Sequence, residues 1–299
     1  MSLSSVEVGE LFGLLAAFAW GITGLLVRAR GAGVNAIVIN AIRNAISGLV
    51  FVLIWFLVSG REPVPLAAWL LLGLSMLTGL GLGDSLYFEA LKRIGVTRAM
   101  PISMAYPVLA SIGAVLLLHE VMGPLAAVGI ALTLGGVYLV AVRPSTSSDG
   151  SSVTSGSPAG YWFGVALAGT AAVSWSFSTL ALSPALQLVD ASTATAIRTP
   201  LASALLFAAA GRAGVLPQAA RLRGSTLAAV VGTGVMSVAS TGLFVWCVSL
   251  AGAGRAAVLT ATSPLFAVPL SVVLLGEPGS WRIVAGTVAS VLGVILLAQ

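Results

Sequence analysis

The sequence predicts an all-α membrane protein, with ten transmembrane helices arranged as two inverted five-helix repeats. Three observations lead to this fold class: a high apolar content, ten apolar runs of membrane-spanning length, and rare residues that recur at a fixed spacing. The apolar fraction is 58% and only 8% of the residues are charged. Because a soluble domain carries about 25% charged residues, most of this surface must face lipid.

The apolar runs fall into two groups of five. A bilayer core needs about 20 apolar residues per helix. Runs of that kind lie at 9–28, 34–59, 66–91, 99–118 and 123–142, and then at 160–182, 191–211, 224–250, 255–275 and 280–298. The segment between the groups contains the run PSTSSDGSS, whose composition is typical of a flexible linker. We therefore divide the chain into a first repeat at 1–143, a linker at 144–159 and a second repeat at 160–299.

Rare residues indicate that the two groups are copies of one unit. The matching pairs are Trp20 with Trp175 and Arg43 with Arg198 at a spacing of 155, then Arg98 with Arg255, Pro107 with Pro264, Glu120 with Glu277, Gly129 with Gly286 and Gly136 with Gly293 at a spacing of 157. Each copy has an odd number of helices, so the second copy must enter the membrane from the opposite side. Inverted repeats of this kind build secondary transporters, with the substrate near the midplane between the copies.

The composition excludes several other classes. A single cysteine, Cys247, and a single histidine, His119, cannot form a disulfide or a zinc cage. The net charge of +5 comes from basic residues scattered at the ends of apolar runs, where they set topology, so a nucleic-acid partner is not expected. The sequence has no HExxH, GxSxG or phosphate-binding loop, which argues against an enzyme. We expect no cofactor and no metal, and as partners only a small-molecule substrate and the lipid bilayer around a monomer.

Three pairs of short motifs recur in the two copies. They are Ala-Trp-Gly at 19–21 with Ser-Trp-Ser at 174–176, Arg98-Ala-Met-Pro with Arg255-Ala-Ala-Val, and Leu-Leu-His-Glu at 117–120 with Leu-Leu-Gly-Glu at 274–277. In these motifs the chain resembles the EamA-type repeats of the drug/metabolite transporter superfamily, over nearly its whole length apart from the linker. The resemblance implies a ten-helix carrier that exports amino acids or other metabolites, and it looks nearest to the aromatic amino-acid exporters. His119 and Asp84 depart from the pattern.

The scarcity of lysine, with only Lys92, indicates a bacterial gene and hence a multi-pass protein of the bacterial inner membrane.

Ionisable groups deep in apolar helices are costly and are candidates for a functional site. Arg43 lies about ten residues into the second helix, roughly mid-bilayer at 1.5 Å per residue. Arg198 is its repeat partner, and Asp84 lies in the third helix. One interpretation is a zwitterion site, in which an arginine binds a carboxylate and Asp84 binds an ammonium group. The other is internal scaffolding, in which the arginines pair with an acid or with carbonyl groups.

Aromatic residues in mid-helix are the second set of candidates. Trp20, Trp175 and Trp246 lie too deep for the interfacial aromatic belt. With Tyr87 and Tyr106 they either line a cavity that stacks flat solutes or pack between helices.

Prolines and glutamates occupy equivalent places in the two copies. Pro107 and Pro264 each remove one backbone hydrogen bond and predict hinges in the fourth and ninth helices, with Ser263 facing a central cavity. Glu120 and Glu277 precede the last helix of each copy, where we expect them to cap the N-terminus of that helix. Glu89, close to Lys92 and Arg93, is expected to form ion pairs at a helix end.

The distribution of basic residues predicts the orientation. Outside the membrane, ten Lys and Arg residues lie in segments away from the N-terminal side and two lie on that side, so the positive-inside rule places both termini outside the cytoplasm. The predicted function is a secondary transporter that exports, or facilitates passage of, amino acids, aromatic ones among them, or similar small metabolites by alternating access. Two alternatives stay open: a proton-coupled multidrug exporter that uses Asp84 or Glu89, and a non-transporting membrane scaffold or receptor.

Overall fold

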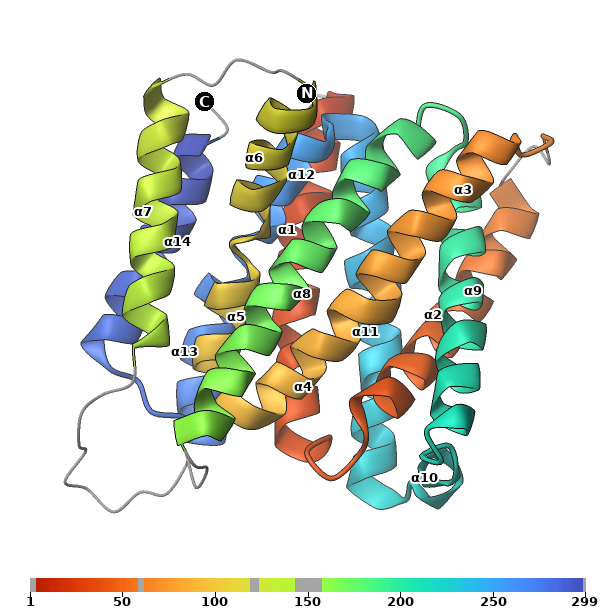
Figure 1. Cartoon of the computed structure of the whole chain (residues 1–299). Helices are drawn as coiled ribbons and strands as arrows, with labels where there is room; N and C mark the ends of the chain where they lie inside the picture. Colours follow the sequence, from red (N-terminus) through yellow and green to blue (C-terminus); the bar gives the residue numbers. More distant parts are fainter. Residues whose placement is uncertain (1–3, 59–61, 119–123, 143–157, 298–299) are drawn as a thin grey trace.

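The fold is a bundle of long helices (Figure 1). The computed structural model describes residues 4–58, 62–118, 124–142 and 158–297. The helices of the first half are α1 (Ser5–Arg30), α2 (Ala36–Val58), α3 (Leu66–Ser75), the π-helical η1 (Met76–Gly83), α4 (Asp84–Ile94), α5 (Val96–Ser103), α6 (Tyr106–Leu118) and α7 (Pro124–Ala141). Those of the second half are α8 (Pro158–Ala185), α9 (Ala191–Arg212), the short α10 (Pro217–Arg221), α11 (Gly224–Ala251), α12 (Ala253–Thr260), α13 (Ser263–Leu275) and α14 (Trp281–Leu297).

Within the described residues, each of the ten apolar runs is mainly helical. Eight described stretches are long and apolar enough to cross a membrane, with α3, η1 and α4 counted as one and α12 with α13 as another. The remaining two runs are α14, a shorter apolar helix, and the broken helix α5–α6. Helix α8 begins at Pro158, two residues before the predicted second repeat, and residues 143–157 of the linker region lie outside the described residues.

The two halves run in opposite directions. Helix α1 begins at one end of the bundle and α8 begins at the other (Figure 1). The packing is reciprocal: α1 packs on α11, and α8 packs on α3 and α4, so that the first helix of each half contacts the third helix of the other. Equivalent helices also pair directly, α2 with α9 and α7 with α14. This is the arrangement that a pseudo-two-fold axis between inverted repeats produces.

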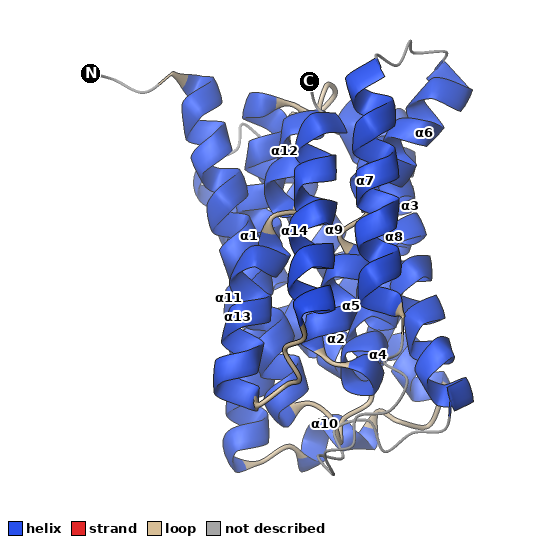
Figure 2. Cartoon of the chain, turned by 90° about the vertical axis from the view of Figure 1, so that its left-hand side faces the viewer, coloured by secondary structure: helices blue, strands red, loops and turns tan. Residues whose placement is uncertain are grey.

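Small residues bring α7 and α14 together, and Figure 2 shows these helices side by side. Thr133 Oγ1 donates a hydrogen bond to the carbonyl oxygen of Ser290 at 3.3 Å, and Ser290 Oγ donates to the carbonyl oxygen of Thr133 at 3.4 Å. A methyl group on Gly136 would overlap the carbonyl oxygen of Gly286. The backbones therefore touch where glycine removes the side chain, as is typical of packed membrane helices.

The fourth and ninth helices are broken at equivalent places. Helix α5 ends at Ser103 and α6 begins at Tyr106, while α12 ends at Thr260 and α13 begins at Ser263. Each break directly precedes a predicted hinge proline, Pro107 or Pro264. Because proline cannot donate the hydrogen bond that a continuous helix needs, the chain begins a new helix at each of these two places. Bending at these breaks during transport stays a prediction.

Glu277 has a structural role, but the prediction that it caps its own helix α14 is wrong. Its carboxylate accepts hydrogen bonds from the backbone N–H groups of Val96 (3.0 Å) and Thr97 (2.9 Å), and so it caps α5 of the other repeat. The cause is local, because Gly276 adopts a left-handed conformation (φ 63°) that turns the chain away from α13. Its repeat partner Glu120 lies outside the described residues. Glu89 forms the predicted ion pairs, with Lys92 at 2.5 Å and with Arg93 at 2.9 Å.

Candidate functional site

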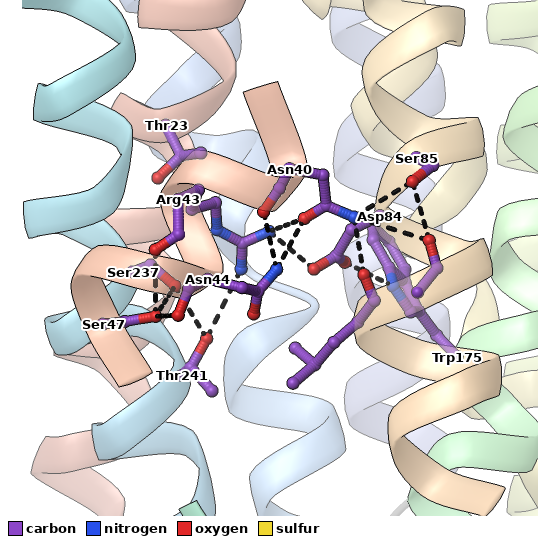
Figure 3. A network of polar contacts seen from close by, with 12 residues as sticks. Thr23, Asn40, Arg43, Asn44, Ser47, Asp84, Ser85, Trp175, Ser237 and Thr241 are labelled. Atoms are coloured by element: carbon purple, nitrogen blue, oxygen red, sulfur yellow. Dashed lines mark hydrogen bonds and ion pairs between the residues drawn. The ribbon is translucent and has the colours of Figure 1, made fainter. Parts of the chain in front are cut away.

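A buried ion pair joins α2 to α4 in the middle of the bundle (Figure 3). Arg43 is fully buried, and its Nη1 lies 2.6 Å from Oδ2 of Asp84. The same nitrogen donates to Oδ1 of Asn40 at 3.3 Å, and Nη2 donates to Thr241 of α11 at 3.4 Å. A buried arginine that is paired with a carboxylate and hydrogen-bonded on both sides is stable inside the membrane. The pair thus favours the scaffolding interpretation for Arg43.

Asp84 is held by both halves of the chain. Its second oxygen, Oδ1, accepts a hydrogen bond of 2.9 Å from the indole Nε1 of Trp175 in α8. Each carboxylate oxygen therefore already has a donor, one from Arg43 and one from Trp175. The negative charge of Asp84 is thus already paired with Arg43, and the binding of an ammonium group by Asp84 stays a prediction.

A π-helical segment places Asp84. In η1 the backbone turns are wider than in an α-helix, and the N–H group of Asp84 donates to the carbonyl oxygen of Gly79, five residues back. Side chains also bond this backbone: Asn40 Nδ2 donates to Leu80 O at 2.6 Å, and Ser85 Oγ donates to Gly81 O at 2.7 Å. The glycines of η1 also allow close packing on α8, since a methyl group on Gly83 would meet the ring of Trp175 at 2.6 Å. Gly79, which faces Ser178, and Gly83 therefore serve the packing of η1 on α8.

Aromatic rings surround the ion pair. The ring centroid of Trp175 lies 5.1 Å from that of Tyr87, 5.9 Å from Trp20 and 6.2 Å from Tyr106. Phe244 of α11 lies 5.8 Å from Trp20. These distances are typical of favourable tilted and edge-to-face pairs. Tyr106 is fixed at its hydroxyl, which lies 2.8 Å from Thr260 Oγ1.

A small cavity lies between the two halves. Its lining comes from both of them: Trp20, Gly79, Leu80, Asp84, Tyr106, Trp175, Ser178, Thr179, Arg198, Thr241 and Phe244. About 30 Å³ is open to the centres of water molecules, which suffices for water but not for an amino acid. Binding of a larger solute therefore requires the helices or the rings of this cavity to move.

Arg198 differs from its repeat partner Arg43. It is 3% exposed and lines the cavity, yet its Nε and Nη1 have no hydrogen-bond partner within the described residues. Its Nη2 contacts Ser178 Oγ at 3.4 Å, at the outer limit of a hydrogen bond. The structure therefore presents one paired and one unpaired arginine at equivalent positions.

The chain as a whole matches a known family. The sequence model described as the EamA-like transporter family matches residues 7–142 and again residues 162–299. The chain belongs to the EamA-like transporter family. It is accordingly a multi-pass membrane transporter and not an enzyme, which confirms the resemblance seen in the sequence motifs.

Two relatives of this EamA-like transporter agree along its length. An uncharacterized transporter of Archaeoglobus fulgidus is 25% identical over 292 residues, which cover 96% of each chain. A protein of known crystal structure is 20% identical, with a TM-score of 0.65 over 96% of this chain and 95% of that one. The second likeness concerns the fold alone.

The predicted site residues separate into three groups by position. Trp20, Asp84, Tyr106, Trp175 and Arg198 line the cavity. Arg43 and Tyr87 lie directly behind it, in contact with Asp84 and with Trp175 respectively. Trp246 and Ser263 do not line it. Trp246 packs against a hydrophobic cluster that includes residues of α1, α8 and α11, and Ser263 is buried with its hydroxyl bonded to Thr260 O.

Sequence reasoning missed Thr241 and Phe244, although the repeat register contains both. Gly95 ends α4 and Gly252 ends α11, with φ of 79° and 87°, so the two glycines are structural equivalents 157 residues apart. Because α4 and α11 are unbroken up to these glycines, the same spacing pairs Asp84 with Thr241 and Tyr87 with Phe244. Pairing the unlike residues of the third helices would have found them.

Proposed function

We propose that this transporter is a secondary carrier that moves amino acids, aromatic ones among them, or similar small metabolites through the cavity between its two repeats. The observation that carries the proposal is the composition of that cavity: flat aromatic faces from Trp20, Trp175 and Tyr106, and a buried cation, Arg198. Aromatic faces suit a flat or apolar side chain, and a guanidinium suits a carboxylate.

Alternating access fits the reciprocal packing of the two halves. Each first helix packs on the broken helix of the other half, α1 on α12 and α13, and α8 on α5 and α6. A relative rotation of the two repeats would open the cavity first toward one side and then toward the other. We propose further that the repeats span 1–143 and 160–299, with a linker at 144–159. The protein would act as a monomer in the bacterial inner membrane with both termini outside the cytoplasm.

The proposal is tested by flux. Purified protein is reconstituted into proteoliposomes loaded with unlabelled amino acids and 3-phenylpropionate, and counterflow of labelled phenylalanine, tryptophan, leucine and 3-phenylpropionate is measured against protein-free vesicles. We expect saturable counterflow for at least one aromatic amino acid or a close metabolite of one. Flux of sugars or of cationic drugs, with none for any amino acid or carboxylate, would contradict the proposed solute class.

The same vesicles separate the two alternatives. Proton-coupled drug export requires a carboxylate that is free to exchange protons, whereas Asp84 is bound to Arg43 and Trp175, and Glu89 to Lys92 and Arg93. A drug flux that is driven by a pH gradient and disappears in Asp84→Asn would nevertheless favour proton-coupled drug export. A scaffold or receptor would show no flux of any solute.

A further inference from the structure

The two repeat-related arginines have different electrostatic environments. Arg43 contacts a carboxylate at 2.6 Å, whereas the hydrogen bond that Arg198 makes within the described residues is to a hydroxyl, that of Ser178, at 3.4 Å. Both side chains are at least nine-tenths buried, so bulk solvent does not surround either guanidinium group. A guanidinium remains charged at any physiological pH, and therefore Arg198 is a buried cation without an ion pair in the described part of the chain.

The repeat register explains why Arg198 lacks an acid. In the first repeat, Arg43 of the second helix pairs with Asp84 of the third helix. The corresponding positions in the second repeat are Arg198 and Thr241. Threonine keeps a hydroxyl but not the charge. One half of the molecule thus carries a complete ion pair, and the other half carries the arginine of that pair alone.

The charge around the cavity is consequently unbalanced. Among the described residues, the charged groups that line the cavity or contact its lining are Arg43, Asp84 and Arg198. Arg98 is also buried, but it lies over the ring of Tyr161 (5.7 Å to the centroid) and does not line the cavity. Two positive charges and one negative charge leave one net positive charge. An uncompensated charge at this depth is costly, so the site favours a ligand that supplies one negative charge.

The negative charge of Asp84 is already paired with the guanidinium group of Arg43, so it does not compensate a further positive charge. A zwitterionic amino acid has no net charge, so it would leave the net positive charge of the cavity uncompensated and would add an ammonium group to it. A monoanion would instead neutralise this net positive charge. The rings of Trp20, Trp175, Tyr106 and Phe244 would contact the rest of such a molecule.

We infer that Arg198 binds the anionic group of the substrate, and that the species carried is a small monoanionic carboxylate with an aromatic or apolar body rather than a zwitterion. This inference rests on the proposed function and narrows its solute class to members with a net negative charge, such as aryl-substituted carboxylic, 2-oxo or 2-hydroxy acids. Arg43 is a positioning residue that holds Asp84.

The test is equilibrium binding to the purified full-length protein, followed by quenching of tryptophan fluorescence, because Trp20 and Trp175 line the site. Three probes share a phenyl ring and differ in charge: 3-phenylpropionate, phenylalanine and 2-phenylethylamine. A hydrogen bond to a charged group contributes about 1.5–3 kcal/mol, which corresponds to roughly 10- to 100-fold in affinity. We expect 3-phenylpropionate to bind about 10-fold or more tightly than phenylalanine, because the ammonium group of phenylalanine adds a buried positive charge that the cavity does not pair. For the same reason we expect the amine to show no saturable binding.

Variants at two positions identify the group responsible. Arg198→Gln should weaken binding of 3-phenylpropionate by about 10- to 100-fold, and Arg198→Lys by less, because lysine keeps the charge. Thr241→Asp introduces the negative charge that the second repeat lacks. Because this charge would compensate the excess positive charge of the cavity, the variant should also bind 3-phenylpropionate more weakly. Thr241→Asn is the size-matched neutral control and should keep the preference for the carboxylate over phenylalanine.

Folding is monitored by the melting temperature of each variant. Arg198→Gln breaks no ion pair, so its melting temperature should equal or exceed that of the parent protein. Tighter binding of phenylalanine than of 3-phenylpropionate to the parent protein would overturn the inference while the proposed carrier function stands. So would binding of 3-phenylpropionate to Arg198→Gln as tight as to the parent protein. If none of the probes binds and no counterflow occurs, both the inference and the proposed solute class are wrong.

Discussion

Arg28 and Glu277, which are 249 residues apart in the chain, form an ion pair in which Nε and Oε1 lie 3.0 Å apart. The same carboxylate caps α5 through the backbone N–H groups of Val96 and Thr97. Arg28 in turn donates to the carbonyl oxygen of Lys92 at 2.7 Å, at the end of α4. One buried carboxylate of the second repeat therefore ties together three helices of the first repeat, α1, α4 and α5.

Replacing Glu277 by glutamine should destabilise the fold. The substitution removes the charge that Arg28 pairs with and weakens acceptance from two backbone N–H groups, for an expected loss of about 2–3 kcal/mol. Thermal unfolding in detergent measures the loss. Glu10→Gln is the control, because its ion pair with Arg255 (3.3 Å) is exposed and such pairs contribute little. Equal effects of the two substitutions would show that the cap of α5 contributes nothing to stability.

Arg43 and Asp84 should behave as one unit. Arg43→Gln leaves Asp84 without its cation, Asp84→Asn leaves a second unpaired arginine, and breaking a buried pair costs about 3–5 kcal/mol. The double variant Arg43→Gln/Asp84→Asn removes both charges and keeps the shapes, so it should recover most of the stability lost in either single variant. A double-mutant cycle on unfolding free energies measures this coupling. Additive losses would mean that the two residues act independently.

The contact between α7 and α14 should tolerate no side chain on Gly136. A Cβ there would meet backbone and side-chain atoms of α14, so Gly136→Ala must force the helices apart. A Cβ on the neighbouring Gly135 would meet no other part of the described structure within 4 Å, so Gly135→Ala is the matched control. We expect a loss of about 1–3 kcal/mol for the first variant only, because overpacking a tight contact has a cost of that size. The melting temperatures of the two purified variants measure the loss, and equal melting temperatures would contradict the prediction.

The fold was predictable because its causes are spread along the sequence. Membrane-spanning length follows from hydropathy, the inversion follows from an odd number of helices per copy, and the breaks lie beside Pro107 and Pro264. The contacts that these polar side chains make between helices were not predictable in the same way. That Glu277 would cap α5 depends on the turn at Gly276, and that Trp175 would bind Asp84 depends on how α8 packs across η1 and α4. Both are contacts between repeats, which no pattern within one helix contains.

The orientation in the membrane can be tested with the one native cysteine left in place. Cys247 is fully buried, so a thiol reagent that cannot cross membranes should react only with a cysteine added at an exposed loop. Glu62 is exposed in the loop before α3, on the side of the N-terminus, and Ala213 is exposed after α9, on the side rich in arginine. The positive-inside rule predicts that Glu62→Cys is labelled on intact cells and that Ala213→Cys is labelled only after permeabilisation. The opposite pattern would place both termini in the cytoplasm, and it would mean that the ten-to-two bias in basic residues does not set the topology of this chain.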